Sequence, residues 1–292
     1  MKRLLKLDLI ALLVGFLLAL PGCVSDKSKS GGELQDVQSF KDYVVRIYRN
    51  KETGMGYFEI LRSGKRMHFQ RGWKFEVGNI QNSDKTNSLL RIGRSITGEG
   101  QPNLVVSEWT GGAHCCFVYY VFQIGDTFKL IDRLDAEHGD NSDFEDLRHN
   151  GNLEFVMADW TFAYWNNCFA DSPAPTVILR YQDSKYRPDL ELMRKPPPND
   201  QDLHLMAENL KAKFANEAET GSNDKWKAPS DLWGKMLDLI YSGNRDSAWK
   251  LLDMSWPANH PNKTEFLEEF KIQLATSPFY RDINQPSFQE AR

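Results

Sequence analysis

The segment 110–116, which reads Thr-Gly-Gly-Ala-His-Cys-Cys, holds the side chains best suited to chemistry. A histidine beside two thiols could bind a metal ion or supply a nucleophile. Zinc sites, however, normally space their thiolates by two or more residues. A nucleophilic cysteine would need a base from elsewhere, because adjacent residues of a strand point to opposite faces. We therefore predict a structural role for Cys115 and Cys116, in a disulfide bond or as small buried groups.

Acidic residues are dense between Asp135 and Asp146, with His138 among them. Calcium takes six to eight oxygen ligands, and carboxylates supply many of them. The run therefore indicates a weak calcium site, and calcium is the one cofactor that it would hold. A solvated acidic turn between two strands explains the same composition with no cofactor. The candidate ligands are Asp140, Asp143, Glu145 and Asp146.

Four aromatic residues lie close together at 160–165. Trp160, Tyr164 and Trp165 could form a flat platform for a carbohydrate or a peptide, with Phe162 beside them. Large aromatic side chains also dominate protein cores, so the same cluster could pack between structural units. An exposed patch would indicate the platform, and a buried one the core.

Other signatures of catalysis are absent from the sequence. It contains no G-x-S-x-G, no H-E-x-x-H, no phosphate-binding loop and no dinucleotide fingerprint. Paired acids such as Asp140 and Asp143 are what a glycoside hydrolase requires. Charged turns produce such pairs by chance, so they define only an alternative function.

Two segments repeat each other at a constant offset of 51 residues. Gly100 corresponds to Gly151, Val105 to Val156, and the pair Trp109-Thr110 to Trp160-Thr161. A fixed period near fifty residues is typical of a repeated β unit, such as a propeller blade.

The first copy, residues 95–106, reads Ser-Ile-Thr-Gly-Glu-Gly-Gln-Pro-Asn-Leu-Val-Val. It resembles the FG-GAP/VCBS type of repeat, whose pattern is roughly D-x-[ND]-G-D-G-x-x-[DE]-[LI]-[VI]-V and whose acidic loop residues bind calcium in many members. The resemblance covers two loop-plus-strand units. It assigns the ligand positions to Ser95, Thr97 and Glu99 in the first copy, and to Asp146, Arg148 and Asn150 in the second. Neither copy supplies three carboxylates, so the resemblance implies the loop conformation more than its metal.

The offset of 51 residues also applies to two of the cysteines. It places Cys168 one residue beyond the counterpart of Cys116. Export would put the chain in an oxidising compartment, where thiols tend to pair. We therefore predict a disulfide bond from Cys168 to Cys116 or to Cys115, with Cys116 favoured. Closing a loop of that length would contribute about 4 kcal/mol to stability by the chain-entropy argument.

The body of the chain reads as β-structure up to about residue 195. Runs of β-branched and aromatic residues flank turn residues at 62–65, 125–126 and 182–185, which predicts three hairpins. Their spacing divides the body into three related units, at 40–94, 95–145 and 146–195. Closed propellers have four to eight blades, so we expect a propeller-like or a stacked-sheet arrangement of antiparallel strands.

Three consecutive prolines at 196–198 end this pattern, and helical periodicity follows. Leu203, Met206, Leu210 and Phe214 recur at the spacing of one helix face. Asn262 and Glu265 have the spacing of a capping box before an apolar run. We predict a small all-α C-terminal domain at 196–292.

The amino terminus predicts export. Residues 1–22 have a basic start, an apolar run from Leu9 to Leu20 and the small residues of a signal peptide. The sequence Leu20-Pro21-Gly22-Cys23 resembles a bacterial lipobox, in which the cysteine is lipidated and becomes the first residue. An ordinary cleaved signal with a chance cysteine is the alternative. Residues 23–39 read as a polar tether, and Val24 after the cysteine favours the outer membrane.

The net charge of the mature chain limits the classes of partner that we expect. Without the signal the chain has 33 basic and 39 acidic residues, a formal charge of −6, and no basic run. That excludes nucleic acid as the expected partner. We expect a lipid-anchored module of the bacterial cell envelope that binds or assembles with a protein or glycan, facing the periplasm or the outside. The alternative is an envelope hydrolase that acts on glycan or peptide through the acids of 135–146.

Overall fold

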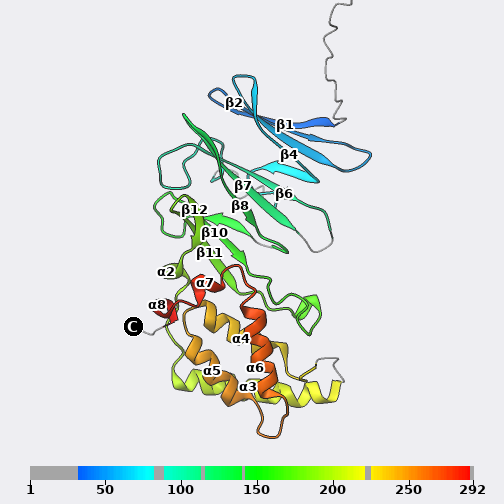
Figure 1. Ribbon diagram of the computed structural model, residues 1–292, viewed down its shortest axis with the longest axis vertical. Helices are drawn as coiled ribbons and strands as arrows, with labels where there is room; N and C mark the ends of the chain where they lie inside the picture. The colour runs from blue at the N-terminus through cyan, green and yellow to red at the C-terminus, as the bar shows by residue number, and fades with distance from the viewer. Residues whose placement is uncertain (1–31, 82–88, 113–115, 140–141, 221–224, 290–292) are drawn as a thin grey trace, which may run out of the picture. The chain divides into compact units, whose positions relative to one another are not determined.

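The computed structural model describes residues 32–81, 89–112, 116–139, 142–220 and 225–289, and of residues 215–220 only the backbone. Residues 32–292 form one compact unit by their internal contacts. The described strands form three four-stranded antiparallel sheets, and seven described helices follow them (Figure 1). A mainly β fold with a helical C-terminal region is confirmed. The described residues form no closed barrel or propeller.

The first sheet, sheet A, contains β1 (Glu33–Phe40), β2 (Tyr43–Arg49), β3 (Gly56–Arg62) and β4 (Lys65–Gly72) in chain order. In β2 and β3 buried residues alternate with half-exposed ones, as a sheet with one covered face requires. The predicted tether at 23–39 is wrong from Glu33 onward, because β1 pairs with β2 from Glu33 to Phe40, with a break in register between Leu34 and Asp36. This strand is polar because it lies at a sheet edge, where little of it is buried.

The second sheet, sheet B, contains β5 (Lys74–Val77), β6 (Asn103–Trp109), β7 (Phe117–Ile124) and β8 (Phe128–Asp135). The third, sheet C, contains β9 (Asp143–Glu145), β10 (Glu154–Ala158), β11 (Thr176–Gln182) and β12 (Lys185–Pro188). Neighbouring strands in each sheet are also neighbours in the chain. This order follows from short connections, which favour antiparallel pairing of consecutive strands.

All three predicted hairpins are confirmed. They join β3 to β4, β7 to β8, and β11 to β12. Two of them turn through a pair of residues with positive φ, Ser63-Gly64 and Asp183-Ser184. A two-residue hairpin loop needs positive φ at both positions to match the twist of its strands.

Sheet B is buried on both faces. Val106, Val118 and Phe122 belong to a hydrophobic core shared with sheet A. The alternate residues Val105 and Tyr119 belong to a larger core shared with sheet C and the helices. Because successive side chains of a strand point to opposite faces, one sheet can contribute to two cores.

The helices begin after sheet C. They are the short α2 (Leu190–Met193), the long α3 (Asp200–Thr220), α4 (Ser230–Tyr241), α5 (Arg245–Ser255), α6 (Lys263–Leu274), α7 (Tyr280–Ile283) and α8 (Pro286–Gln289). The predicted capping box is wrong: Asn262 has φ 68° and its side chain makes no capping hydrogen bond. None of the helices among the described residues is both long and apolar enough to cross a bilayer.

The loop after β10 joins sheet C to the helices by two buried contacts. Trp165 packs against Trp226, Trp233 and Phe270, with ring centroids 4.8–6.2 Å apart. Asp159 accepts hydrogen bonds of 2.5 Å from the hydroxyls of Tyr241 and Ser277. These contacts fix the position of the segment that follows β10.

Candidate binding pocket between the repeated loops

The two repeated loops lie side by side. The backbone N–H of Leu153, at the end of the second loop, donates to the carbonyl of Ile96 in the first at 2.8 Å. A Cβ on Gly98 would lie only 2.9 Å from the Asn152 side chain. Gly98 has φ +83°, a conformation that glycine adopts without strain. The glycine therefore allows both the turn and the close approach.

Each loop is held by a side chain of its own. The Asp146 carboxylate accepts the N–H groups of Asn150 and Gly151 at 2.9 and 3.0 Å. The Asn103 side chain accepts the N–H of Ile96 at 2.9 Å. Asp and Asn commonly close loops in this way, because their short side chains reach nearby backbone N–H groups.

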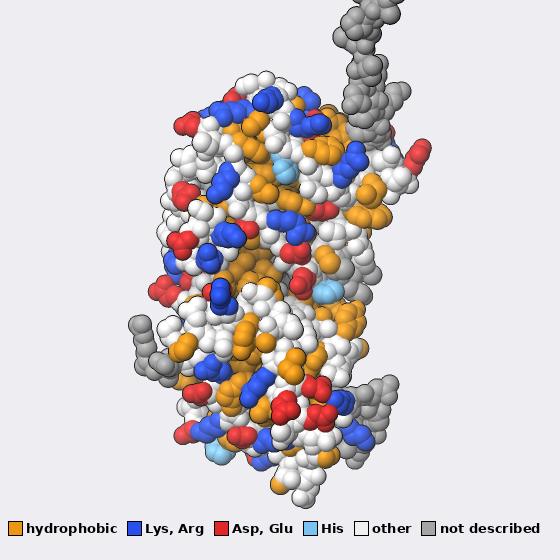
Figure 2. Space-filling model, in the orientation of Figure 1, with side chains coloured by type: hydrophobic (Ala, Val, Ile, Leu, Met, Phe, Trp, Pro, Cys, Tyr) orange, Lys and Arg blue, Asp and Glu red, His pale blue; other side chains and the backbone are white. Residues whose placement is uncertain are grey.

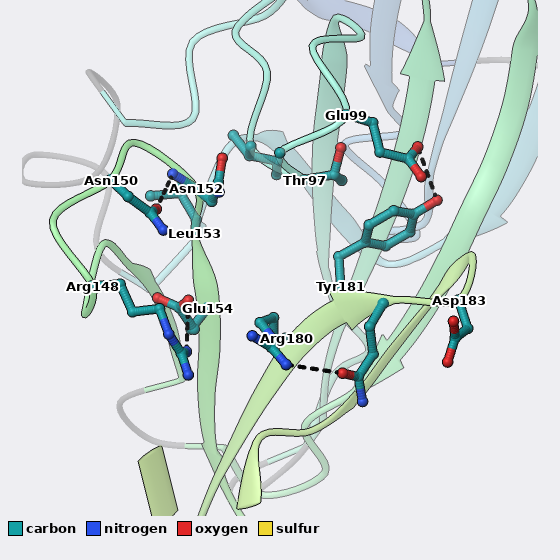
Figure 3. A pocket seen from close by; sticks show the side chains of 13 residues that line it. Thr97, Glu99, Arg148, Asn150, Asn152, Leu153, Glu154, Arg180, Tyr181 and Asp183 are labelled. Carbon is teal, nitrogen blue, oxygen red and sulfur yellow. Dashed lines mark hydrogen bonds and ion pairs between the residues drawn. The ribbon is translucent and has the colours of Figure 1, made fainter. Parts of the chain in front are cut away.

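Together with the β11–β12 hairpin, the loops enclose a polar pocket of about 310 Å³ (Figure 3). The side chains that Figure 3 labels come from all three segments and surround one space. The polar and charged residues of the lining are Thr97, Glu99, Arg148, Asn150, Asn152, Glu154, Arg180, Tyr181, Gln182 and Asp183.

Arg148 organises one wall of the pocket. Its guanidinium donates to Asp189 at 2.5 Å, to Glu191 at 2.8 Å and to Glu154 at 3.4 Å. The hydrogen bond with Asp189 is the main reason that the pKa of Arg148 is raised. Burial alone would raise the pKa of Asp189, but hydrogen bonds from Arg148 and from the Leu192 N–H outweigh it, and that pKa is lowered. The wall therefore carries fixed charges that are already paired.

Arg180 and Tyr181 extend the lining along β11, and Arg180 shares Asp189 with Arg148. The Arg180 guanidinium donates to Gln182 at 3.1 Å and lies 3.3 Å from Asp189, and 43% of its side chain is exposed. The Tyr181 hydroxyl donates to Glu99 at 3.3 Å, which joins β11 to the first loop. Burial, and next the charge of Glu99, raise the pKa of Tyr181. The phenol therefore keeps its proton at neutral pH.

Thr97 is a buried polar group that the protein leaves unsatisfied. The side chain lines the pocket, its residue is 8% exposed, and its hydroxyl has no hydrogen-bond partner. Buried polar atoms are nearly always hydrogen-bonded, so such an atom in a pocket wall is available to a ligand or an ordered water.

The lining offers hydrogen-bond donors and acceptors in similar numbers. Two arginines face three carboxylates, those of Glu99, Glu154 and Asp183. The amides of Asn150, Asn152 and Gln182 add both donors and acceptors. A pocket with nearly balanced charge and mixed donors and acceptors fits a neutral ligand rich in hydroxyl groups.

Positions from the resemblance meet in this pocket. Thr97 and Glu99 from the first copy, and Arg148 and Asn150 from the second, all line it. Asp146 instead caps its own loop. The described residues contain no group of three or more His, Cys, Asp or Glu able to hold a metal ion.

The predicted calcium ligands do not line the pocket. Asp140 lies outside the described residues. Asp143 accepts a hydrogen bond from Asn79 at 2.9 Å, and Glu145 is exposed on β9. A calcium site that includes Asp140 stays a prediction.

The three aromatic residues of the predicted platform take different positions. Tyr164 is 57% exposed. Trp160 stacks on Phe169, with ring centroids 5.2 Å apart. Trp165 packs among the helices. A ligand role for Trp160 and Tyr164 stays a prediction, whereas Trp165 has a packing partner within the protein.

Cys168 is a free thiol in the structure and donates a hydrogen bond to Asp171 at 3.1 Å. Cys115 lies outside the described residues. The disulfide bond from Cys168 to Cys116 or Cys115 stays a prediction, which non-reducing peptide mapping can check.

Sequence reasoning missed the part of the pocket that β11 supplies. The sequence pattern places Arg180, Tyr181 and Gln182 in a hairpin and does not mark them as a site. One signal was present: Arg180 follows the apolar run Val177-Ile178-Leu179 in a strand. A charged residue in such a strand is expected to face either solvent or a polar site.

Comparisons with known proteins give one relative and no family. No family model matches the chain, and no solved structure is significantly similar to it. The chain is 28% identical over 181 residues to the "Probable thylakoid lumen protein sll0997" of Synechocystis sp., which covers 56% of this chain and 50% of the relative. The chain thus spans about half the length of the curated relative it matches.

Proposed function

We propose that the protein is a lipid-anchored binding module of the bacterial cell envelope, with its ligand site in the pocket between the repeated loops. The observation that carries the proposal is the convergence of three segments, the two loops and the β11–β12 hairpin, on one polar pocket. Binding sites typically place a few polar groups in a concave surface, where they fix the orientation of the ligand.

The ligand class follows from the chemistry of the wall. The pocket lining has two arginines and three carboxylates, and Arg148 is already paired with Asp189. A strongly charged ligand would therefore find few charged groups in the lining that are free to pair with it. The hydroxyl of Thr97 and the amides of Asn150 and Asn152 suit a ligand that both donates and accepts. The pocket volume of about 310 Å³ lies at the lower end of the range for small-molecule sites. We assign the pocket to a neutral saccharide of the envelope.

Calorimetry with glucose, N-acetylglucosamine and its β-1,4-linked disaccharide tests the assignment. Arg180→Ala and Asn152→Ala should each weaken binding of the best probe about 10-fold, because each removes hydrogen bonds in a partly desolvated site. Arg187→Ala is the matched control. Arg187 lies opposite Arg180 on β12 but outside the lining, so its loss should leave the affinity unchanged. Absence of binding by all three probes, or equal losses in the control, would contradict the saccharide assignment.

The proposed cellular location is based on the amino-terminal sequence. Cys23, at the end of the signal, is the proposed lipidation site, and the outer membrane is the proposed location. The name of the Synechocystis relative assigns that protein to the thylakoid lumen, which supports an exported chain without naming its membrane. Cys23→Ser should release the protein from membranes or leave the precursor uncleaved. Unchanged processing and retention would reject lipidation.

The three sheets support the proposal that the chain contains degenerate β repeats of the FG-GAP/VCBS type, arranged in a propeller-like or stacked manner. Each sheet is a four-stranded meander, the topology of one propeller blade. Weak calcium binding in the segment 135–146 belongs to the same proposal. Calorimetry at millimolar calcium tests it, with Asp140→Ala plus Asp143→Ala expected to abolish the heat.

The hydrolase alternative has no specific support from the geometry. Three described acids of its loop bond to protein groups: Asp135 pairs with Arg133 at 3.1 Å, Asp143 accepts from Asn79 at 2.9 Å, and Asp146 closes its own loop. A binding function is therefore the better proposal.

A further inference from the structure

The outer face of sheet A is a half-exposed surface of aromatic, aliphatic and arginine side chains. The opposite face carries Tyr43, Val45 and Phe58 into the core. On the outer face, the rings of Tyr48 and Tyr57 stack at 4.5 Å, and Tyr57 lies 5.3 Å from Phe69. These three rings form a row across β2, β3 and β4.

Cations and exposed aliphatic groups surround this row. The guanidinium groups of Arg66 and Arg71 lie 5.2 and 5.5 Å from the centre of the Phe69 ring. Opposite Tyr48 and Arg46 in the register, β1 places Leu34 and Val37, which are 51% and 49% exposed. Figure 2 shows Lys and Arg side chains beside hydrophobic ones over sheet A, at the top of the view.

The charge of sheet A has the opposite sign to that of the whole chain. Residues 33–72 contain eight Lys or Arg and five Asp or Glu, a formal charge of +3, whereas the whole chain has −4. On the outer face itself, Arg46, Arg66 and Arg71 outnumber the single carboxylate of Glu59. A basic surface with exposed apolar groups is complementary to an anionic lipid surface.

The chain enters the fold beside this face. A Cβ on Gly32 would lie 3.2 Å from Tyr48 and 3.3 Å from Tyr57. Nine residue steps separate Gly32 from the proposed lipidation site, Cys23, so the two lie at most about 30 Å apart. A lipid on Cys23 would therefore hold this face close to the membrane.

We propose that the outer face of sheet A docks on the anionic headgroup surface of the membrane that holds the lipid anchor. Leu34 and Val37 enter the headgroup region, while Arg66 and Arg71 pair with lipid phosphates. The lipid then provides attachment and the face provides orientation. The proposal adds a second membrane contact to the proposed function and rests on its lipid anchor only for the choice of membrane.

Vesicle flotation with unlipidated protein tests the face by itself. Residues 32–292 form one compact unit by their internal contacts, so the assay uses a chain of residues 24–292. It should bind vesicles of equal parts phosphatidylglycerol and phosphatidylcholine at least about 10-fold more strongly than pure phosphatidylcholine, and lose this binding at high salt. Arg66→Glu plus Arg71→Glu should reduce binding to the mixed vesicles at least about 10-fold, and Val37→Asp should reduce it less.

A matched control distinguishes the effect of the sheet A face from the effect of the protein's net charge. Lys235→Glu plus Lys250→Glu makes the same charge change at exposed positions of α4 and α5 and should leave vesicle binding within about twofold. Equal losses in both double variants, or no preference of the unchanged protein for anionic vesicles, would overturn the proposal. Failure of lipidation or of saccharide binding would leave these results unaffected, because neither takes part in the assay.

Discussion

Sheets A and C share a topology but use their outer faces differently. Each is a four-stranded antiparallel meander with one face in a hydrophobic core. The outer face of sheet A carries an aromatic row with arginines around it. On sheet C, α2 and α4 contact β11, and Arg148 and Arg180 pair with Asp189 there.

The difference is also one of charge. Sheet A has a formal charge of +3, and the rest of the chain has 28 basic and 35 acidic residues, a charge of −7. One meander can therefore carry an open surface while another supports a pocket, because burial in the core constrains the residue types of only one face. In sheet A one face is in the core and the other is half exposed, whereas helices α2 and α4 contact β11 of sheet C.

The largest expected effect separates the two faces of sheet A. Phe58 is fully buried and contacts the rings of Phe75 and Phe122, so Phe58→Ala should lower the free energy of unfolding by about 4 kcal/mol. Phe69→Ala, on the outer face of the same sheet, should cost about 1 kcal/mol. Urea denaturation measures both. Similar losses would mean that the outer face is also a structural core.

The next effect concerns the link between sheet C and the helices. Asp159 is 3% exposed and accepts from Tyr241 and Ser277, so Asp159→Ala leaves two buried hydroxyls without this partner. We expect a loss of about 3 kcal/mol in the free energy of unfolding. Asp171→Ala removes an exposed carboxylate of the same β10–β11 segment and should change the free energy of unfolding by less than about 0.5 kcal/mol. Equal losses in the two variants would show that the hydrogen bonds of Asp159 do not stabilise the contact between sheet C and the helices.

A smaller loss is expected at the pocket wall. Arg148→Leu leaves Asp189 and Glu154, each 1% exposed in its side chain, without their main cation. Since Arg148 is itself 21% exposed, we expect a cost of about 2 kcal/mol at neutral pH. The pKa of Asp189 is lowered in the folded state, so its contribution is lost as the pH falls through that value. The variant should therefore lose less stability on acidification, and parallel pH profiles would contradict this account.

The smallest expected effect is a pH dependence of the free energy of unfolding, caused by the buried Glu108. Glu108 is 6% exposed, and its carboxylate accepts from the Tyr120 hydroxyl at 2.8 Å. Burial raises the pKa of Glu108 above its ordinary value of 4.5. The folded protein therefore holds this proton more tightly than the unfolded chain, and stability falls as the pH rises from 4.5 through the raised value.

Glu108→Gln removes this ionisation and keeps an oxygen for Tyr120 to donate to. Its stability relative to the unchanged protein should rise over the same pH interval and then stay constant. Denaturation at a series of pH values measures the difference. A difference that does not vary with pH would show that Glu108 ionises as freely in the folded state as in the unfolded chain.

Local sequence patterns predicted most strands and the three hairpins. Alternation of buried and exposed residues in β2 and β3, and turn residues such as Gly64 and Asp183, are local signals that act within a few residues. Helix α3 also followed from local periodicity, since apolar residues such as Leu203, Leu210 and Phe214 recur on one helix face. β1 was missed because an edge strand that buries little needs no apolar pattern.

The tertiary structure alone decided which side chains meet. Arg148 lies 41 residues from Asp189 in the chain, and Glu99 lies 82 residues from Tyr181, yet each pair is in hydrogen-bond contact. It also placed Trp165 in the helical core, whereas Tyr164, its neighbour in the chain, is exposed. Local patterns encode which face of a strand is buried. They do not encode which distant segment covers that face, because this depends on how the sheets and helices pack as whole elements.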